Sequence, residues 1–426
     1  MHKPLALFNN KKIFYGWFVL AGAFIILFFN AICYSILGIV MKPVSIDMGW
    51  TPKDMSMAVF IYMIIHSVSV PVGGKVYDRF GPRVAIILFS LFILVGNVLA
   101  AFTHSYVLFI AAFGVFVGIG MGGPASPLLG AIICKWFTRY RGLAISLAIA
   151  GFCAGLFVLV PITTYFVEHV GWRQAFLAVG IVLFVVNTLV TLTIIKGDPK
   201  DFGLKPLGAG EIGDKPAKAF DPIHDINMGN ALKTSGFWYM LVVMTVCGVG
   251  CTYMSMYFIN VAVDYNIEMQ SAANILGLTG IYSIVGMLVA GPLADKMGGR
   301  WPLAVTMLFR VIGFGVVLYA QTIFTFNILA LLMGLTLMAT LPISNTVAAN
   351  MFGTSHIGFI TGIFTTGHHA GGAILAVLVG IIFKATGNYN MVFIIILIIC
   401  IVGAVAALLI KEKRYYLENG KIIQEN

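Results

Sequence analysis

The sequence predicts an all-α membrane protein whose 12 transmembrane helices form two pseudo-symmetric six-helix halves. The first observation is composition: of 426 residues, 60% are hydrophobic and 10% are charged, whereas soluble globular proteins carry about 25% charged residues. The second is a mean hydropathy of +0.98, with apolar stretches long enough to cross a bilayer following one another along the chain. The third is an internal repeat. Together they exclude an ordinary soluble enzyme.

The formal net charge is +10, from 26 Lys and Arg against 16 Asp and Glu. In a soluble chain such an excess would suggest a nucleic-acid partner. Here the basic residues lie in short connections between apolar stretches, where they set membrane topology. The expected surroundings are therefore the lipid bilayer, and no nucleic acid is expected. The first apolar run is too long for a cleavable signal, so it is interpreted as the first transmembrane helix.

Each apolar stretch is expected to be a helix, because backbone groups inside a bilayer must be hydrogen-bonded within the protein. Connections rich in Gly, Pro or charged residues separate the stretches. The twelve predicted spans are residues 14–40, 54–76, 83–103, 106–132, 142–167, 172–196, 235–260, 271–294, 301–320, 323–349, 357–385 and 389–411.

The distribution of basic residues predicts the orientation. Connections on one side hold few cations, namely Lys42, Lys53, Arg173 and Lys384. The other side collects Lys3, Lys11, Lys12, Lys75, Arg79, Arg83, Lys135, Arg139, Arg141, Lys296, Arg300, Lys411, Lys413, Arg414 and the 197–233 segment. Since cytoplasmic loops are enriched in Lys and Arg, both termini are expected to be cytoplasmic in a multi-pass protein of the cytoplasmic (plasma) membrane.

Residues 197–233 are rich in Gly, Pro and charge, unlike the chain on either side. This composition is typical of a linker. It predicts an N-terminal six-helix half at 1–196, a cytoplasmic linker at 197–233 and a C-terminal half at 234–426.

The two halves repeat one another. VGGKVYDRFGPR at 72–83 aligns with VAGPLADKMGGR at 289–300 at a constant offset of 217. A second register, at offset 216, pairs Gly118 with Gly334, Gly142 with Gly358, Gly151 with Gly367, Ala154 with Ala370 and Gly155 with Gly371. Two six-helix repeats imply a transporter that rocks around a central site.

The string G-G-x-x-x-D-R-x-G-x-R at 73–83 resembles the loop between helices 2 and 3 of the major facilitator superfamily, and 291–300 resembles its weaker C-terminal copy. The resemblance covers the whole chain and implies the major facilitator fold. It also implies that the Asp and the basic residues latch the halves together on the cytoplasmic side in the outward-open state. The expected gate residues are Gly74, Asp78, Arg79, Gly81, Arg83, Asp295, Lys296 and Arg300.

A narrower resemblance lies at 135–151, KWFTRYRGLAISLAIAG, which is similar to the signature of monocarboxylate transporters and the related oxalate:formate antiporters. Tyr140 and Ser146 depart from that signature, standing where a basic residue and a glycine are usual. Tyr15-Gly16-Trp17 and GDPKDFGLKP, directly after the sixth span, also resemble this branch.

Carboxylates are absent from the cores of the predicted spans, because Asp47, Asp54, Glu168, Asp264 and Glu268 fall in outer connections. Proton-coupled sugar carriers and many drug exporters of the superfamily use a carboxylate in the first or fourth helix, so this chain is not expected to work in that way. The fifth span also lacks the glycine-proline motif of drug antiporters.

The spans do contain histidine, the residue type whose ordinary pKa lies near neutral pH: His66 is in the second span, and His368 and His369 are in the eleventh. A histidine can be buried neutral and gain a proton when an anion arrives, which suits anion binding or proton coupling. At offset 216 the pair replaces Phe152 and Cys153, so the second half gains polarity there. Packing against neighbouring backbone is the alternative reading for all three histidines.

Arg310 is the fixed charge placed deep inside a predicted span, which makes it a functional candidate, with a structural role as the alternative. Carboxylate carriers of the resembled branch usually place an arginine in the eighth helix, and the oxalate:formate type adds a lysine in the eleventh. The eighth span here, SAANILGLTGIYSIVGMLVAGPLAD, has neither, so an anionic substrate would depend on His368 or His369 and on tyrosine hydroxyls. The ranked neutral candidates for substrate binding are Tyr34, Tyr253, Tyr257 and Asn345.

The six cysteines are predicted to be small core residues. Their spacing does not predict a metal site, apart from a loose Cys247/Cys251 pair, and no cofactor is expected.

These observations favour a secondary active transporter for a small organic acid, a mono- or dicarboxylate, working by alternating access as a proton symporter or an anion exchanger. A carrier for a neutral or cationic solute, including drug efflux, is the alternative, favoured by the missing arginine of the eighth helix. A membrane enzyme or sensor is a remote alternative, because the sequence contains no catalytic motif and no output domain. The expected partners are the small-molecule substrate and, for symport, protons.

Overall fold

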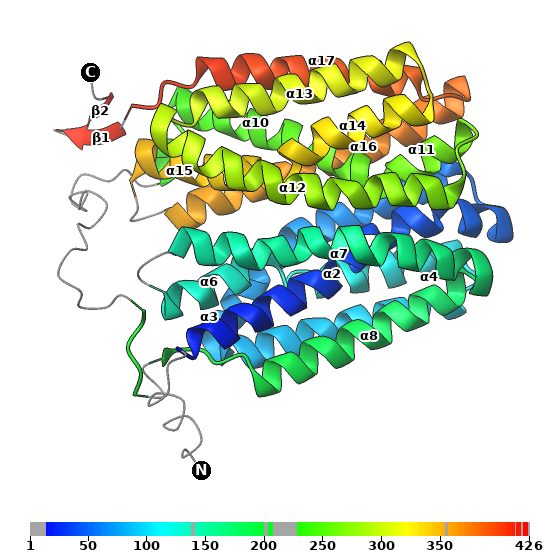
Figure 1. Ribbon diagram of the computed structural model, residues 1–426, viewed down its shortest axis with the longest axis horizontal. Coiled ribbons are helices and arrows are strands. Elements are labelled where there is room, and N and C mark those ends of the chain that lie inside the picture. The colour runs from blue at the N-terminus through cyan, green and yellow to red at the C-terminus, as the bar shows by residue number, and fades with distance from the viewer. Residues whose placement is uncertain are drawn as a thin grey trace. The chain divides into compact units, whose positions relative to one another are not determined.

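The computed structural model describes residues 14–137, 141–199, 203–207, 228–353, 357–413, 415–418 and 421–424 (Figure 1). The described chain is almost entirely helical, as expected for a protein that must satisfy its backbone inside a bilayer. Ten helical segments are long and apolar enough to cross a membrane. Two shorter apolar helical segments, 106–120 and 126–136, lie in the fourth predicted span.

Most spans form single helices, and each of the twelve predicted spans corresponds to helical structure. The uninterrupted helices are α2 (Gly16–Met48), α7 (Arg141–Val170), α8 (Trp172–Thr193), α12 (Met269–Met297), α13 (Arg300–Tyr319), α16 (Ile357–Thr386) and α17 (Asn390–Leu409). The second and third spans form one continuous element, α3 (Pro52–Phe102), which bends at Gly81. The linker segment contributes the short helix α9 (Met228–Ala231).

Three spans that the hydropathy pattern predicts as continuous are interrupted. The fourth consists of α4 (Tyr106–Phe109), the π-helix η1 (Ile110–Val117), α5 (Gly118–Gly120) and α6 (Ser126–Trp136). The seventh consists of α10 (Ser235–Thr252), the π-helix η4 (Tyr253–Tyr257) and α11 (Phe258–Asp264), and the tenth of α14 (Ile323–Leu337) and α15 (Thr340–Phe352). In the fourth span the break falls at 121–125, where Pro124 removes a backbone donor.

The helices also extend beyond the predicted apolar spans at several ends. Asp47, Asp54, Glu168 and Asp264 were expected in outer connections, but they lie in the terminal turns of α2, α3, α7 and α11. A helix continues past its apolar core wherever its polar end reaches water or headgroups, and hydropathy does not detect that extension.

The chain divides into two compact units. The first contains residues 1–48 and 64–215, and the second contains 49–63 and 216–426. Residues 49–63, which include the first turns of α3, therefore belong to the second unit, where the Met63 sulfur accepts a hydrogen bond from the Thr252 hydroxyl at 4.0 Å.

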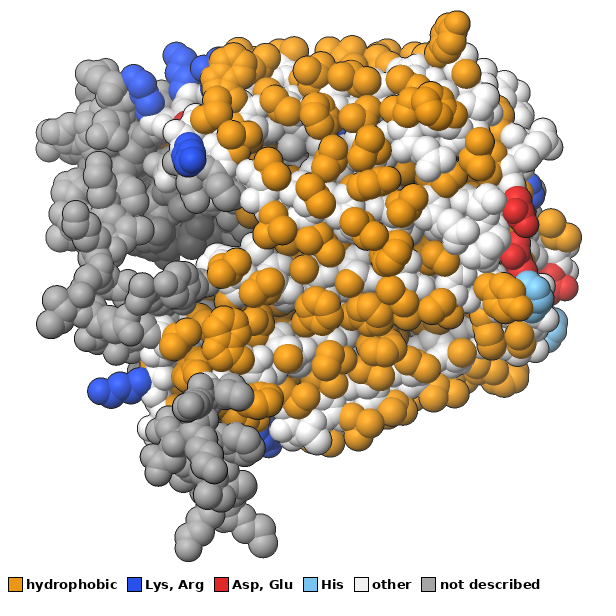
Figure 2. Space-filling model, in the orientation of Figure 1, with side chains coloured by type: hydrophobic (Ala, Val, Ile, Leu, Met, Phe, Trp, Pro, Cys, Tyr) orange, Lys and Arg blue, Asp and Glu red, His pale blue; other side chains and the backbone are white. Residues whose placement is uncertain are grey.

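Outward-facing side chains of both units are largely apolar, which is the pattern expected of helices surrounded by lipid (Figure 2). Examples are Ile181 and Leu189 on α8 in the first unit, and Leu288 on α12 and Leu308 on α13 in the second.

Glycines allow the closest helix contacts in each unit. On α7, a β-carbon at Gly155 would lie 2.1 Å from the carbonyl oxygen of Phe28 on α2. On α16, a β-carbon at Gly371 would lie 2.0 Å from the carbonyl oxygen of Thr245 on α10. Small residues allow backbones to approach in this way inside a bilayer.

After α17, residues Tyr415–Glu418 (β1) and Lys421–Gln424 (β2) pair as an antiparallel hairpin. The Tyr415 ring stacks on Phe352 at the end of α15, with ring centroids 5.9 Å apart. This contact joins the hairpin to the second unit.

Candidate functional site

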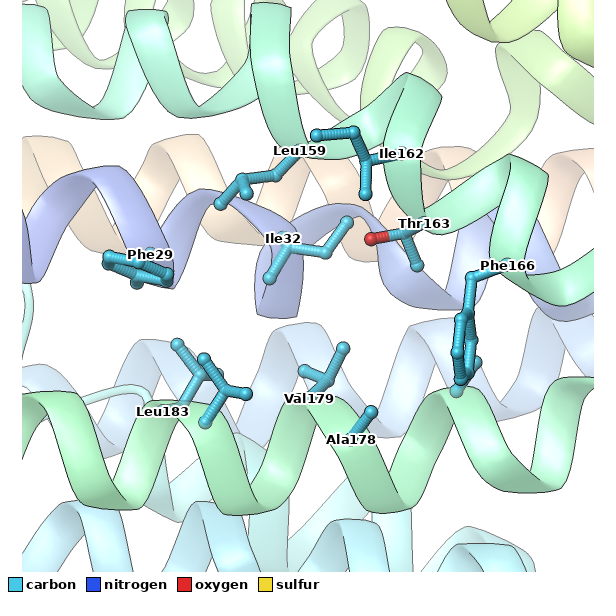
Figure 3. A pocket seen from close by; sticks show the side chains of 11 residues that line it. Phe29, Ile32, Leu159, Ile162, Thr163, Phe166, Ala178, Val179 and Leu183 are labelled. Atoms are coloured by element: carbon cyan, nitrogen blue, oxygen red, sulfur yellow. The ribbon is translucent and has the colours of Figure 1, made fainter.

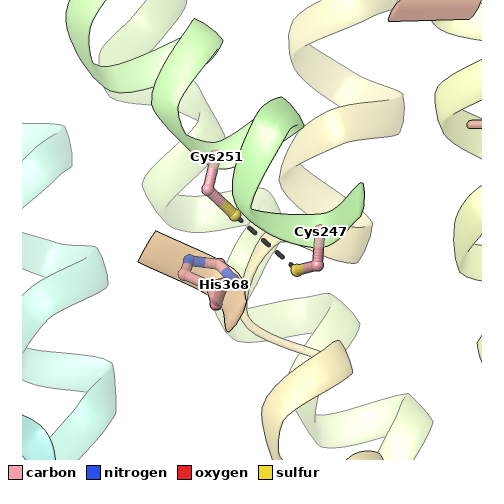
Figure 4. Close-up of side chains that lie close together, drawn as sticks. All are labelled: Cys247, Cys251 and His368. Carbon is pink, nitrogen blue, oxygen red and sulfur yellow. Dashed lines mark hydrogen bonds between the residues drawn. The ribbon is translucent and has the colours of Figure 1, made fainter. Parts of the chain in front are cut away.

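Two cysteines and a histidine meet inside the second unit (Figure 4). Cys247 and Cys251 lie one turn apart on α10, and their sulfur atoms are 3.9 Å apart. His368 approaches them from α16, and the three candidate ligand atoms lie within 4.8 Å of one another. Nδ1 of His368 is buried and has no hydrogen-bond partner among the described residues. We call these three residues the Cys-His cluster.

The Cys-His cluster exists because α10 and α16 are in backbone contact at this depth. A β-carbon at Gly248 would lie 1.7 Å from the carbonyl oxygen of His368. The glycine therefore lets the backbone of α16 reach α10 beside the two thiols. The neighbouring His369 is also buried, and its ring meets the His368 ring edge to face with centroids 5.4 Å apart.

Arg310 lies next to the Cys-His cluster with its side chain fully buried. From α13 its guanidinium donates to the carbonyl oxygen of Cys247 at 3.0 Å and to the Cys247 sulfur at 3.3 Å. Within the described part of the chain, no carboxylate forms an ion pair with Arg310. A buried cation without a carboxylate partner is costly, and four contacts with oxygen and sulfur acceptors offset this cost.

The break between α14 and α15 supplies two further acceptors. Arg310 donates to the carbonyl oxygen of Thr336 at 3.2 Å and to the hydroxyl of Thr340 at 3.5 Å, on either side of the break. Carbonyls at a helix end lack their intrahelical partners. Arg310 therefore ties the interrupted tenth span to α10 and satisfies polar groups inside the unit.

The repeat gives this region a counterpart in the first unit. At offset 217, Cys247 and Cys251 correspond to Asn30 and Tyr34 on α2, and at offset 216 His368 corresponds to Phe152 on α7. The Tyr34 ring lies 6.0 Å from that of Phe152, so the corresponding residues also contact one another there. The first unit therefore has an amide, a phenol and an apolar ring where the second has thiols and an imidazole.

The counterpart positions include one of the predicted histidines. His66 on α3 is 5% exposed, and its ring centroid lies 6.4 Å from that of Tyr34. Asn30 donates to the Asn187 side chain at 3.0 Å, and Asn187 donates to the Ser90 hydroxyl at 2.9 Å. This chain of side-chain hydrogen bonds joins α2, α8 and α3 inside the first unit.

The other neutral candidates are on η4, which directly follows α10, and on α15. Tyr253 and Tyr257 are fully buried on η4, and Tyr253 packs against Phe314 and Phe393 with ring centroids 5.0 and 6.0 Å away. The Tyr253 hydroxyl is buried without a hydrogen-bond partner among the described residues. Asn345 on α15 is exposed within its unit.

The predicted gate residues are at the two equivalent turns of the repeat. Asp78, Arg79 and Arg83 are exposed around the bend at Gly81, and Gly74 lies about two turns before that bend in α3. In the copy, Lys296 and Arg300 are exposed, and the side chain of Asp295 lies outside the described residues.

The C-terminal segment contacts the second of these turns, which sequence reasoning did not identify. Glu412 accepts hydrogen bonds from the Gly299 backbone N–H at 2.7 Å and from the Asn350 side chain at 3.0 Å. One carboxylate therefore fixes the turn between α12 and α13 to the end of α15. A single Glu in a basic tail gives no sequence signal for this role.

The three branch-like sequence segments pack together at one end of the first unit. The rings of Tyr15 and Trp136 lie 5.5 Å apart, and those of Trp17 and Phe137 lie 5.2 Å apart. Trp136 donates from its indole to the Lys196 carbonyl at 3.1 Å, and its own carbonyl accepts from the Leu207 N–H at 2.9 Å. Arg139 and Tyr140 of the signature lie outside the described residues. The described part of the signature therefore makes packing contacts.

Arg83, one of the predicted gate residues, affects the pKa of Tyr15 at this end of the first unit. Tyr15 donates from its hydroxyl to the Ile194 carbonyl at 3.1 Å. Burial raises the pKa of that hydroxyl, and the positive charge of Arg83 opposes the increase. A tyrosine that is protonated near neutral pH can keep donating this hydrogen bond, which joins the start of α2 to the end of α8.

An apolar pocket opens between α2, α7 and α8 in the first unit (Figure 3). Its volume is about 190 Å³, and Thr163 supplies the one polar side chain among its lining residues. Pockets for small organic ligands typically enclose roughly 300–1,000 Å³ and contain several convergent polar groups. This pocket does not have the character of a site for an organic acid.

Repeated six-helix units, interrupted spans and buried polar groups define a multi-pass membrane transporter. The Major Facilitator Superfamily model matches residues 23–289 and 245–422, so the two matches together cover nearly all of the chain. The chain therefore belongs to the Major Facilitator Superfamily, whose members are transporters and not enzymes.

Several curated relatives are monocarboxylate transporters. The chain is 24% identical over 389 residues to monocarboxylate transporter 13 of Bos taurus, covering 89% of this chain and 86% of the relative. It is 25% identical over 306 residues to monocarboxylate transporter 12-B of Danio rerio, covering 66% of this chain and 62% of the relative. It is 24% identical over 314 residues to human monocarboxylate transporter 12, covering 66% and 57%. This chain thus spans less than two thirds of the length of the last two relatives.

Proposed function

We propose that the protein is a secondary active transporter that moves a small organic acid, a mono- or dicarboxylate, by alternating access. The observation that carries the proposal is the similarity to a monocarboxylate transporter over 389 residues. We further propose the cytoplasmic (plasma) membrane as its location, with both termini cytoplasmic, from the positive-inside distribution of Lys and Arg.

The groups that would offer countercharge to an anion are histidines. His368 is half-buried on α16, and its Nδ1 is buried without a hydrogen-bond partner among the described residues. His369 on α16 and His66 on α3 are buried inside predicted spans. Histidine can take up a proton near neutral pH, so an arriving carboxylate could stabilise the charged imidazole. Tyr34, beside His66, would add a ring for the apolar body of the substrate and a hydroxyl for its polar end.

Arg310 is less suited to direct binding. Four of its contacts are with Cys247, Thr336 and Thr340, which occupy both terminal nitrogens of the guanidinium. We assign it a positioning role, in which it fixes the region that carries the histidine. Both proton symport and anion exchange are compatible with this arrangement, since histidine can bind protons and anions.

The engagement of Arg310 by protein atoms supports a second candidate function, a carrier for a neutral or cationic solute, including drug efflux. The deep cation is already used by protein atoms, and the basic residue of α12 is Lys296 at its end. An anionic substrate would therefore lack a fixed positive partner from these two helices.

The deciding experiment is counterflow in liposomes that contain the purified protein. Small mono- and dicarboxylates would be screened with and without an imposed pH gradient. Saturable uptake driven by the gradient is expected for symport, and uptake that requires internal carboxylate and ignores the gradient is expected for exchange. Failure of all carboxylates, with a control carrier active in the same vesicles, would refute the organic-acid proposal and favour neutral or cationic solutes.

A further inference from the structure

We propose that the Cys-His cluster, Cys247, Cys251 and His368, binds one soft, monovalent metal ion of the Cu(I) type. This site goes beyond the proposed transport of an organic acid and does not depend on it. A metal-bound imidazole cannot also take up a proton, so in the metal-loaded protein His369 and His66 would provide the countercharge for the substrate. The metal site rests on three features of the second unit: the spacing of the ligand atoms, the position of the His368 imidazole beside the two thiols and the charge of Arg310.

The spacing of the two sulfurs suits a shared metal ion. At a metal–sulfur distance of about 2.3 Å, two thiolates lie about 3.8 Å apart in tetrahedral geometry and about 4.0 Å apart in trigonal geometry. The observed distance is 3.9 Å. The i,i+4 spacing on α10 places both sulfurs on one helix face, so the helix preorganises the pair.

His368 supplies the third ligand from the facing helix (Figure 4). Its candidate nitrogen lies within 4.8 Å of both sulfurs, and contraction to about 4 Å gives three-coordinate geometry. One of its two ring nitrogens, Nδ1, is buried without a hydrogen-bond partner among the described residues, and the imidazole is in hydrogen-bond contact with the Cys247 thiol. Thiolate and imidazole ligands together select soft or borderline ions such as Cu(I) and Zn²⁺.

Charge decides between these ions. Binding to two thiols and a neutral imidazole releases two protons, because the thiolate is the ligand. With a monovalent ion the cluster then carries one negative charge, which the Arg310 guanidinium, 3.3 Å from the Cys247 sulfur, neutralises. A divalent ion would leave the cluster neutral and the buried arginine uncompensated. Since no described carboxylate pairs with Arg310, the monovalent ion gives the charge-balanced site.

The first unit contains an internal contrast. Asn30, Tyr34 and Phe152 occupy the corresponding repeat positions, and none of these side chains is a ligand for a soft ion. The proposed site therefore belongs to the second unit alone, and one ion per chain is expected.

Silver(I) is the probe, because it is a soft monovalent ion that does not change oxidation state under assay conditions. The purified full chain in chloride-free detergent solution would be titrated by calorimetry, with thiolate-to-metal absorption as a second readout. The background variant would carry Cys33→Ala, Cys134→Ala, Cys153→Ala and Cys400→Ala, which removes the other thiols. We expect one equivalent of Ag(I), with the release of two protons.

Variants on that background test each ligand. Cys251→Ala and His368→Ala should each weaken Ag(I) binding at least about tenfold, whereas His369→Ala, the matched neighbour, should leave it unchanged. Should the background variant not fold, the same substitutions in the native chain are compared by the Ag(I)-dependent rise in Tm. Equal loss from His368→Ala and His369→Ala, or none from Cys251→Ala, overturns the site.

Zinc(II) provides the test of the charge argument. Zn²⁺ should bind more weakly than Ag(I), and tighter binding of Zn²⁺ would overturn the assignment of a monovalent ion. All these measurements are made without a transport substrate. A failure to bind Ag(I) therefore leaves the proposed carboxylate transport untouched, and a failure of counterflow leaves the metal site untouched.

Discussion

Gly81 and Gly298, which lie 217 positions apart in the sequence, adopt the same backbone conformation. Their φ and ψ angles are 81° and 172° for Gly81, and 76° and 166° for Gly298. Each sits in the motif that the two copies of the internal repeat share, one between the second and third spans and one between α12 and α13. The repeat is therefore expressed in the backbone as well as in the sequence of both turns.

Alanine at either turn should strain the backbone, because this region of positive φ is essentially restricted to glycine. Gly81→Ala and Gly298→Ala are each expected to cost about 1–3 kcal/mol and to lower the Tm of the purified protein. Gly74→Ala is the matched control, since a β-carbon there would have no atom within 4 Å and α3 is helical at that point. Equal Tm values for Gly74→Ala and Gly81→Ala would show that the turn tolerates a side chain.

The glycines that join the first and fifth helices of each unit give a second prediction. Gly155→Ala and Gly371→Ala would each place a methyl group against a backbone carbonyl, at 2.1 and 2.0 Å. Backbone atoms cannot rotate away, so the helices must separate, at a cost of about 1–3 kcal/mol. Thermal unfolding in detergent and transport activity would both report this change.

Gly142 and Gly362 are the controls for that pair, because added β-carbons there would have no atom within 4 Å. Their alanine variants should unfold near the wild-type Tm. If all four variants behaved alike, helix propensity rather than close packing would explain the effect.

Hydropathy and the repeat predicted the spans because each helix must cover about the thickness of the bilayer with apolar side chains. The interruptions at η1, η4 and between Leu337 and Thr340 were not predicted. The residues at these places are mostly apolar or small, so composition does not distinguish a break from a continuous span. Pro124 was the available signal for the break in the fourth span.

The candidate site was only partly visible in the sequence. The depth of Arg310 and the polarity of His368 follow from their positions in apolar spans. Their proximity to Cys247 depends on the packing of α10, α13 and α16, which no local pattern encodes. The four-residue spacing of Cys247 and Cys251 is the sequence signal for this cluster, because it places both thiols on one face of a helix.

Arg310 is expected to act mainly through stability. Arg310→Met replaces the guanidinium with a shorter apolar side chain and removes its hydrogen bonds to the Thr336 and Cys247 carbonyls, and each hydrogen bond to a charged group contributes about 1.5–3 kcal/mol. Arg310→Lys keeps the charge but cannot reproduce the planar set of donors. We expect both variants to lower Tm, with the apparent KM of any surviving transport nearly unchanged. A normal Tm with a large increase in KM would instead indicate direct substrate binding.

The histidines provide the last prediction, which separates substrate binding from packing. If the imidazole of His368 supplies countercharge, His368→Ala should reduce carboxylate counterflow at least about tenfold, because the loss of one charge-assisted hydrogen bond is about 1.5–3 kcal/mol. His368→Gln retains polarity without a titratable group, so it should restore stability without restoring any dependence on pH. His66→Ala tests the corresponding role in the first unit, where Tyr34 is the neighbour. Transport at the wild-type rate by a His368→Ala/His369→Ala double variant would remove both residues from the binding site and assign them to helix packing.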